Sequence, residues 1–125
     1  ESVATLTRIA SGAPPEKALQ TLMRAYLSKE HLEGPETGCP MAALGSEMSR
    51  QAPEVRRAAT RRIKEAIDLV ARQFPDWGKP AAHEQALATL STMVGAMVLA
   101  RAVDDPKLSD AFRSAALKHS TSTNS

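Results

Sequence analysis

The sequence is poor in the residues that cross-link a small domain or bind metal ions. Only one of its 125 residues is cysteine, which excludes a disulfide framework within the chain. The histidines His31, His83 and His119 are widely separated, and none has the ligand spacing of a zinc site. We expect neither a metal ion nor another cofactor in this protein.

Aromatic residues are also scarce, and this scarcity indicates the fold class. They make up 3% of the chain, whereas 22 residues are alanine. Alanine favours helices, while strands favour aromatic and β-branched side chains. A chain of 125 residues is long enough for one domain with a hydrophobic core. The composition therefore predicts an all-α domain, a helical bundle.

A strong excess of charge and a long apolar segment are missing too. The formal net charge is +2, and the basic residues form no polybasic face for nucleic acid. The longest uncharged, largely apolar stretch covers residues 85–100, which is shorter than the ~20 residues that span a bilayer. We recognise no signal peptide. We expect a cytoplasmic protein without membrane contact.

Prolines divide the chain into helices, because proline is accepted in the first turn of a helix and disrupts its interior. Apolar residues recur at helical spacing between the prolines. Asp104 and Asp105 precede Pro106 and are typical of a helix cap. The predicted helices cover residues 16–31, 40–51, 53–74, 80–103 and 107–119, with a helical stub at 2–10.

The third of these full helices carries a cluster of arginines and lysine opposite its apolar face. Opposite charges lie four residues apart in the pairs Arg61 and Glu65, Lys64 and Asp68, and Asp68 and Arg72. The pattern therefore favours a solvent-exposed face with weak ion pairs over a phosphate-binding surface.

The helix predicted for residues 80–103 has no charged face between residues 85 and 100. A helix that is apolar on all sides must be covered on all sides, and a small bundle with a thin core does not cover it completely. A second copy of the chain would supply the cover; the alternative is the central helix of a monomeric bundle. The predicted dimer interface consists of Leu87, Ala88, Ser91, Gly95, Val98, Leu99, Ala102 and Phe112.

Cys39 precedes Pro40 and so lies near the start of a predicted helix. The positive end of a helix dipole stabilises a thiolate, which makes Cys39 a candidate reactive thiol for oxidants or electrophiles. The alternative is a small residue in a tight turn. The surrounding sequence does not resemble that of a catalytic cysteine, and we predict no catalytic residue.

Bulky apolar residues on the first full helices predict either a filled core or an adaptable ligand pocket. Small alanines between them leave volume, and few polar groups project inward, so a ligand there would be hydrophobic or aromatic. Trp77 would close such a pocket or plug the end of the bundle. The candidate wall residues are Met23, Tyr26, Leu27, Met41, Leu44, Met48, Ile63, Ile67, Phe74, Met93 and Met97.

Several runs of sequence resemble the C-terminal domain of TetR/AcrR-type transcriptional regulators. The most specific run covers residues 99–109 (LARAVDDPKLS), and shorter runs cover residues 38–47 (GCPMAALGSE) and 53–56 (PEVR). The alanine-rich stretch 86–96 is similar but less specific. The resemblance extends from residue 14 to about residue 118, and the order and lengths of the helices agree.

The resemblance implies a domain that binds a small effector between its first helices and dimerises through its last two. It also implies an N-terminal helix-turn-helix domain for operator DNA, which we expect to precede Glu1 in the parent protein. Residues 1–12 then correspond to the end of a linking helix, 13–119 to the effector-binding and dimerisation domain, and 120–125 to a flexible tail.

The expected function is that of a non-enzymatic homodimer, a repressor that a small hydrophobic effector releases from DNA. Two alternatives belong to other classes of protein. One is a small helical redox or electrophile-sensing protein that uses Cys39, and the other is a dimerisation module without a pocket.

Overall fold

A computed structural model describes residues 3–33 and 50–122 of the chain. Within these ranges the structure contains helices and no strand, which confirms the predicted all-α class. The helix predicted for residues 40–51 lies outside them, except for its last two residues. The elements are α1 (Val3–Ser11), the 3-10 helix η1 (Pro15–Lys17), α2 (Ala18–Tyr26), α3 (Lys29–Glu33), α4 (Pro53–Ala71), α5 (Pro80–Ala102) and α6 (Pro106–Ser122).

The long helices begin at prolines, as the sequence predicts. α4 begins at Pro53, α5 at Pro80 and α6 at Pro106. Proline fits there because a residue in the first turn needs no N–H group for an intrahelical bond. At the start of α6, Oδ1 of Asp105 also accepts hydrogen bonds from the next two backbone N–H groups after Pro106, at 3.0 and 3.2 Å. The predicted helix cap is therefore confirmed.

The helix predicted for residues 16–31 is interrupted. α2 ends at Tyr26, and α3 begins at Lys29. Between them the hydroxyl of Ser28 donates to the carbonyl oxygen of Ala25 at 2.8 Å, and such a local bond competes with continuation of the helix. The apolar periodicity runs through this point, so it gives no sign of the break.

α6 is longer than predicted and ends at Ser122, so the prediction of a flexible tail over 120–125 is wrong for residues 120–122. Ser120 is only 3% exposed and lies on the same side of α6 as the buried Ser109 and Ala116. Serine is small enough to pack against a neighbouring helix. The polar composition of residues 120–122 therefore does not prevent them from forming the end of α6.

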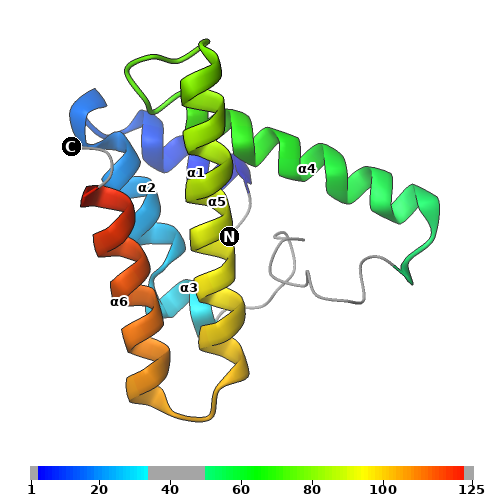
Figure 1. Ribbon diagram of the computed structural model, residues 1–125, viewed down its shortest axis with the longest axis vertical. Helices are drawn as coiled ribbons and strands as arrows, with labels where there is room; N and C mark the ends of the chain where they lie inside the picture. The colour runs from blue at the N-terminus through cyan, green and yellow to red at the C-terminus, as the bar shows by residue number, and fades with distance from the viewer. Residues whose placement is uncertain (1–2, 34–49, 123–125) are drawn as a thin grey trace.

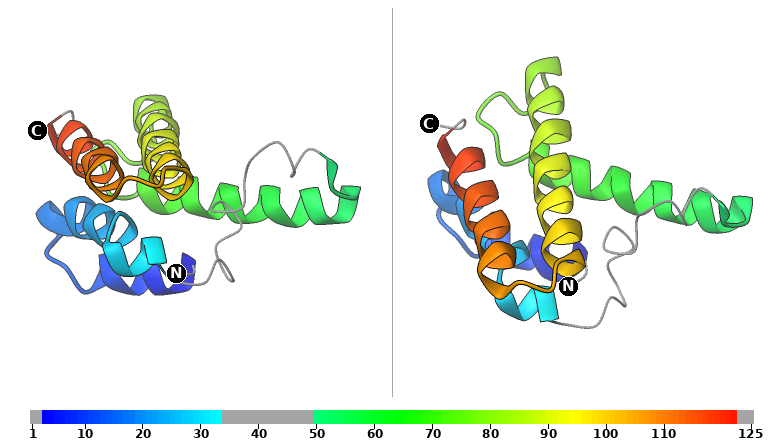
Figure 2. Two further views of the ribbon diagram at one scale, coloured as in Figure 1. Left: turned by 90° about the horizontal axis from the view of Figure 1, so that it is seen from below. Right: turned by 60° about the horizontal axis from the view of Figure 1, so that its bottom comes forward.

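The helices form two layers. α5 and α6 lie side by side and antiparallel, joined by the short connection 103–105 (Figure 1). α1, α2 and α3 form the second layer, and the left view of Figure 2 shows them on one side of the α5–α6 pair. α4 packs against α5 with its C-terminal part, whereas its N-terminal part extends away from the other helices (Figures 1 and 2).

The core lies between the two layers and consists mainly of aliphatic residues and methionines, with the aromatic side chains of Tyr26 and Phe74. Its largest fully buried side chains are Tyr26, Leu22 and Met23 of α2 and Met93 and Met97 of α5. The flexible thioether side chains fill the space that the many alanines leave. The methionines of α2 and α5 therefore serve as core residues.

Two arginines join the layers by donating to backbone carbonyl groups. Nη1 of Arg113 in α6 donates to the carbonyl oxygen of Leu27, the C-cap of α2, at 3.0 Å. Nε of Arg101 in α5 donates to the carbonyl oxygen of Leu32 in α3 at 3.2 Å. The last carbonyl groups of a helix have no intrahelical partner, and a cation is favourable at this negative end.

Replacement of Arg113 by methionine should lower the free energy of unfolding by about 1.5–3 kcal/mol, because the carbonyl of Leu27 loses a charged donor. The side chain of Arg113 is only 12% exposed, so water does not fully replace it. Lys107→Met is the matched control, since Lys107 lies exposed on the same helix. Urea denaturation at one fixed protein concentration measures both variants. Equal stability of the two would contradict the anchoring role of Arg113.

Candidate functional site

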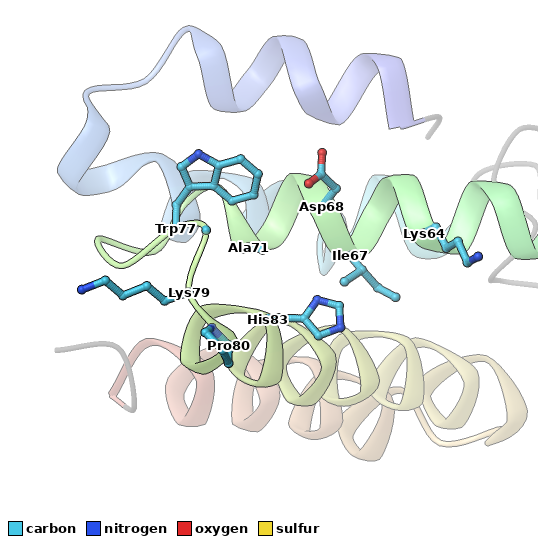
Figure 3. A pocket seen from close by; sticks show the side chains of 9 residues that line it. Lys64, Ile67, Asp68, Ala71, Trp77, Lys79, Pro80 and His83 are labelled. Carbon is cyan, nitrogen blue, oxygen red and sulfur yellow. The ribbon is translucent and has the colours of Figure 1, made fainter.

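A cavity of about 590 Å³ opens between α4 and α5, near the connection that joins them (Figure 3). This volume lies within the range of ~300–1,000 Å³ that is typical of small-molecule sites. We call it the α4–α5 groove. It is lined by Lys64, Ile67, Asp68, Ala71, Trp77, Gly78, Lys79, Pro80 and His83.

The walls of the groove are mostly apolar and come from both helices. Ile67 and Ala71 lie one turn apart on α4, so both face α5. Pro80 and His83 belong to the first turn of α5. In Figure 3, Ile67 points from α4 toward His83, and Trp77 stands at the end of the groove where the connection begins.

The connection between α4 and α5 places Trp77 by means of tight turns. The N–H of Trp77 donates to the carbonyl oxygen of Phe74 at 3.1 Å, and the N–H of Lys79 donates to that of Asp76 at 3.0 Å. Gly78 adopts φ of 93°, a left-handed conformation that glycine adopts without steric cost. Trp77 is 51% exposed, so it borders the groove and does not plug the end of the bundle.

Arg72 holds the indole ring from one side. Its guanidinium carbon lies 5.0 Å from the centre of the Trp77 ring, within the range of a cation–π interaction. Nε of Arg72 also contacts Oδ2 of Asp68 at 3.0 Å. Arg72 is not among the residues that line the groove, whereas Trp77 is. The ring therefore contacts Arg72 on one side and faces the groove on another.

The charged side chains around the groove carry a net positive charge. Lys64 lies at one end, Lys79 at the other, and Asp68 and His83 between them. Asp68 forms the predicted ion pair with Arg72. The other predicted pair of Asp68, with Lys64, is not formed in the described part of the chain. Figure 3 shows the ammonium groups of Lys79 and Lys64 both directed outward, at opposite ends of the groove. Lys79 lies at the end with Trp77, and Lys64 lies at the other end.

The predicted pocket residues fall into three groups. The first group consists of Ile63 and Ile67, which are partly buried against the core. Ile67 is the one predicted pocket residue that lines the α4–α5 groove. The predictions for Met41, Leu44, Met48 and the thiol of Cys39 lie outside the described residues. The other six are packed into the core: Met23, Tyr26, Leu27, Phe74, Met93 and Met97.

Most groove residues that the sequence analysis does not select are polar or lie in the connection, and the exceptions are Ala71 and Pro80 at the facing ends of α4 and α5. The charge pattern places Lys64 on an exposed face, and the spacing of the histidines gives no reason to select His83. Trp77 gave the one available signal, because a lone tryptophan between two helices is expected to cover something apolar.

A second candidate surface is the side of α5 that faces away from the core. Leu87 is 42% exposed and Leu99 is 46% exposed, which is unusual for large apolar residues on one helix face. A Cβ atom added to Gly95 would have no neighbour within 4 Å. On α6, Leu108 is 43% exposed and Phe112 is half-buried. We call this surface the outer face: it consists of Leu87, Ala88, Ser91, Gly95, Val98, Leu99 and Ala102 of α5 and Leu108 and Phe112 of α6.

The comparison with protein families agrees with this architecture. Residues 15–114 match the family of LmrA/YxaF-like transcriptional regulators, in its C-terminal domain. The chain belongs to this family. It is a TetR-type regulatory domain, as the resemblance in its sequence indicated, and this type of domain binds ligands and dimerises in regulators. Searches of curated proteins and of solved structures gave no match.

α5 of this regulatory domain is long and apolar enough, by length and composition alone, to cross a membrane. It has 23 residues, and its most apolar window has a mean hydropathy of 1.2. The uncharged stretch 85–100 is thus the central part of a longer helix, whose ends add further residues to the apolar window. Core helices of soluble proteins meet the same criterion, and 39% of the window is buried within the fold.

Replacement of Gly78 by alanine should lower the free energy of unfolding by about 1 kcal/mol, because alanine does not easily adopt the positive φ at this position. No atom lies within 4 Å of the added Cβ, so the cost comes from the backbone alone. Gly12→Ala is the matched control, since its Cβ would make ordinary contacts at 3.5 and 3.8 Å. It should be neutral or slightly stabilising. Thermal and urea denaturation measure both variants, and a loss of stability in Gly12→Ala alone would contradict this account.

Proposed function

We propose that this chain senses a small hydrophobic effector and holds together the two subunits of a transcriptional repressor. The observation that carries the proposal is the outer face, a large apolar surface left uncovered in a domain of this family. An isolated soluble monomer rarely exposes an extended apolar helix face. The parent protein would act in the cytoplasm and bind its operator through an N-terminal domain that precedes this chain.

The outer face supports a homodimer with two-fold symmetry. In such a dimer the same surface of both subunits meets, so α5 and α6 of each copy form a four-helix arrangement. The small residues Ala88, Ser91 and Gly95 allow the two α5 helices to approach closely, while Leu87 and Leu99 supply apolar area. The covered area would compensate for the thin core of the single chain.

The regulatory mechanism follows from the separation of the two DNA-binding domains. A two-fold dimer binds two half-sites in successive major grooves, about 34 Å apart. An effector that binds one arrangement of the subunits more tightly shifts the population toward that arrangement. If the favoured arrangement separates the DNA-binding domains incorrectly, the affinity for the operator falls.

A dimerisation module without an effector site is the second candidate. It is favoured by one observation: six of the predicted wall residues are buried in the core cluster. The α4–α5 groove is the observation against it, because its volume suits a small molecule. A thermal shift screen separates the two, since a ligand of the folded state raises the melting temperature.

Gly95→Arg should weaken dimerisation by several kcal/mol, because it places an unpaired charge in the dimer interface. The single chain tolerates the change, since the position is open. Gln85→Arg is the matched control: Gln85 is exposed on the same helix and lies outside the outer face. Sedimentation equilibrium at micromolar concentration should give a dimer for the original chain and the control, and a monomer for Gly95→Arg. A dimer that is indifferent to Gly95→Arg would rule out this interface.

The isolated chain should not bind duplex DNA in a sequence-specific manner. Arg56, Arg57, Arg61 and Arg62 are exposed along α4, but the described helices include none that is placed for reading bases. Mobility-shift assays compare a candidate operator with a shuffled duplex. Weak retardation of both that disappears as salt increases is expected from counterion release. Tight binding that prefers one sequence at physiological salt would contradict the prediction.

A further inference from the structure

The α4–α5 groove combines three features that together define a class of ligand: an apolar floor, an aromatic ring at one end, and a cation at the other. Met23, Met93, Met97 and Tyr26 belong to the core cluster and do not line the groove, so the groove is a separate space. Its chemistry comes from residues of α4, of α5 and of the connection between them.

The apolar lining of the groove and the indole ring of Trp77 favour a ligand with a flat aromatic ring system. Ile67, Ala71 and Pro80 present apolar surface, and the indole ring of Trp77 stands beside them. Aromatic rings stack on or pack edge-to-face against tryptophan with favourable geometry. The guanidinium carbon of Arg72 lies 5.0 Å from the centre of the indole ring and favours this orientation of the ring before a ligand arrives. A site that is already ordered loses less entropy on binding.

The charges favour an anion over a cation. Asp68 is the acidic side chain among the residues that line the groove, and it forms an ion pair with Arg72 at 3.0 Å. Lys64 has no ion pair within the described part of the chain. His83 offers a ring nitrogen between the two ends. A carboxylate near Lys64 and His83 would gain a charged donor, whereas an ammonium group there would be repelled.

The length of the groove selects the size of the ligand. Lys64 and Ala71 are seven residues apart, which is about 10 Å along a helix of 1.5 Å rise per residue. A molecule whose ring contacts Trp77 and whose acid group reaches Lys64 must span most of this distance. A bicyclic acid meets this requirement better than a single ring.

We propose that the α4–α5 groove binds a bicyclic aromatic carboxylate, with its rings between Trp77 and Ile67 and its carboxylate at Lys64 and His83. This inference rests on the proposed effector-sensing function and names its site and the chemical class of its ligand.

Trp77 provides a direct readout, because it is the single tryptophan of the chain. Its indole N–H gives one resonance in a proton–nitrogen correlation spectrum of the 125-residue chain. The probes are naphthalene-2-carboxylate, naphthalene-2-methanol and naphthalene-2-methylamine, which share a ring system and differ in charge. The carboxylate should shift the indole resonance in a saturable manner and bind more tightly than the other two probes.

Lys64→Gln should weaken binding of the carboxylate by about two- to fivefold, the range for one exposed charge pair, and leave binding of the methanol unchanged. Arg61→Gln is the matched control, because Arg61 lies exposed on the same helix and does not line the groove. It should change the binding of none of the three probes. Both variants alter exposed side chains, so folding is preserved.

Three results would overturn the assignment. Equal affinities for all three probes would show that the carboxylate does not contribute to binding. If Lys64→Gln and Arg61→Gln changed the affinity for the carboxylate probe equally, Lys64 would have no specific role. A probe that raises the melting temperature without shifting the indole resonance would place the effector site elsewhere and leave effector sensing standing. If no probe binds while the chain still dimerises, the groove assignment fails and the dimerisation role is untouched.

Discussion

The need to cover α5 is the physical constraint on which the rest of the structure depends. This helix is apolar around most of its circumference, and each part of its surface left in water costs free energy in proportion to the apolar area. α4 and α6 cover one side, together with the core residues Met23 and Tyr26 of α2. Arg101 and Arg113 then fix the opposite layer to α5 and α6. The remaining side carries Leu87 and Leu99, and the chain itself has nothing described to place there.

Much of the fold could be predicted because its main signals are local. A proline in the first turn and an aspartate before it specify the start of α6 without reference to any other helix. The break after Tyr26 and the extension of α6 depend instead on single hydrogen bonds and on which side of a helix meets a neighbour. Ser120 is polar by composition and buried by position. No local sequence pattern distinguishes a buried serine such as Ser120 from an exposed one.

The candidate site was less predictable, for the same reason. Periodicity identifies the inward residues of a helix, and in this chain the most inward residues, such as Met93 and Met97, are already covered by core partners. A groove forms where packing is incomplete, at the edge of the core, where Ile67 meets the turn of Trp77. That position depends on the angle between α4 and α5 and on the left-handed turn at Gly78. Neither quantity can be read from residue spacing.

The place of the groove beside the outer face would connect a bound ligand with the packing of the proposed dimer. His83 lines the groove, and Leu87, one turn further along α5, lies on the same side of the helix and belongs to the outer face. A ligand that contacts His83 therefore lies next to the surface on which the second subunit would pack. If the ligand binds one packing of the two α5 helices more tightly than another, the difference in binding free energy is a coupling free energy. By linkage, the ligand changes the equilibrium between the two packings by the same factor by which the packing changes the affinity for the ligand. In such an arrangement α5 carries residues of both surfaces, so a single helix would connect the bound ligand with the second subunit.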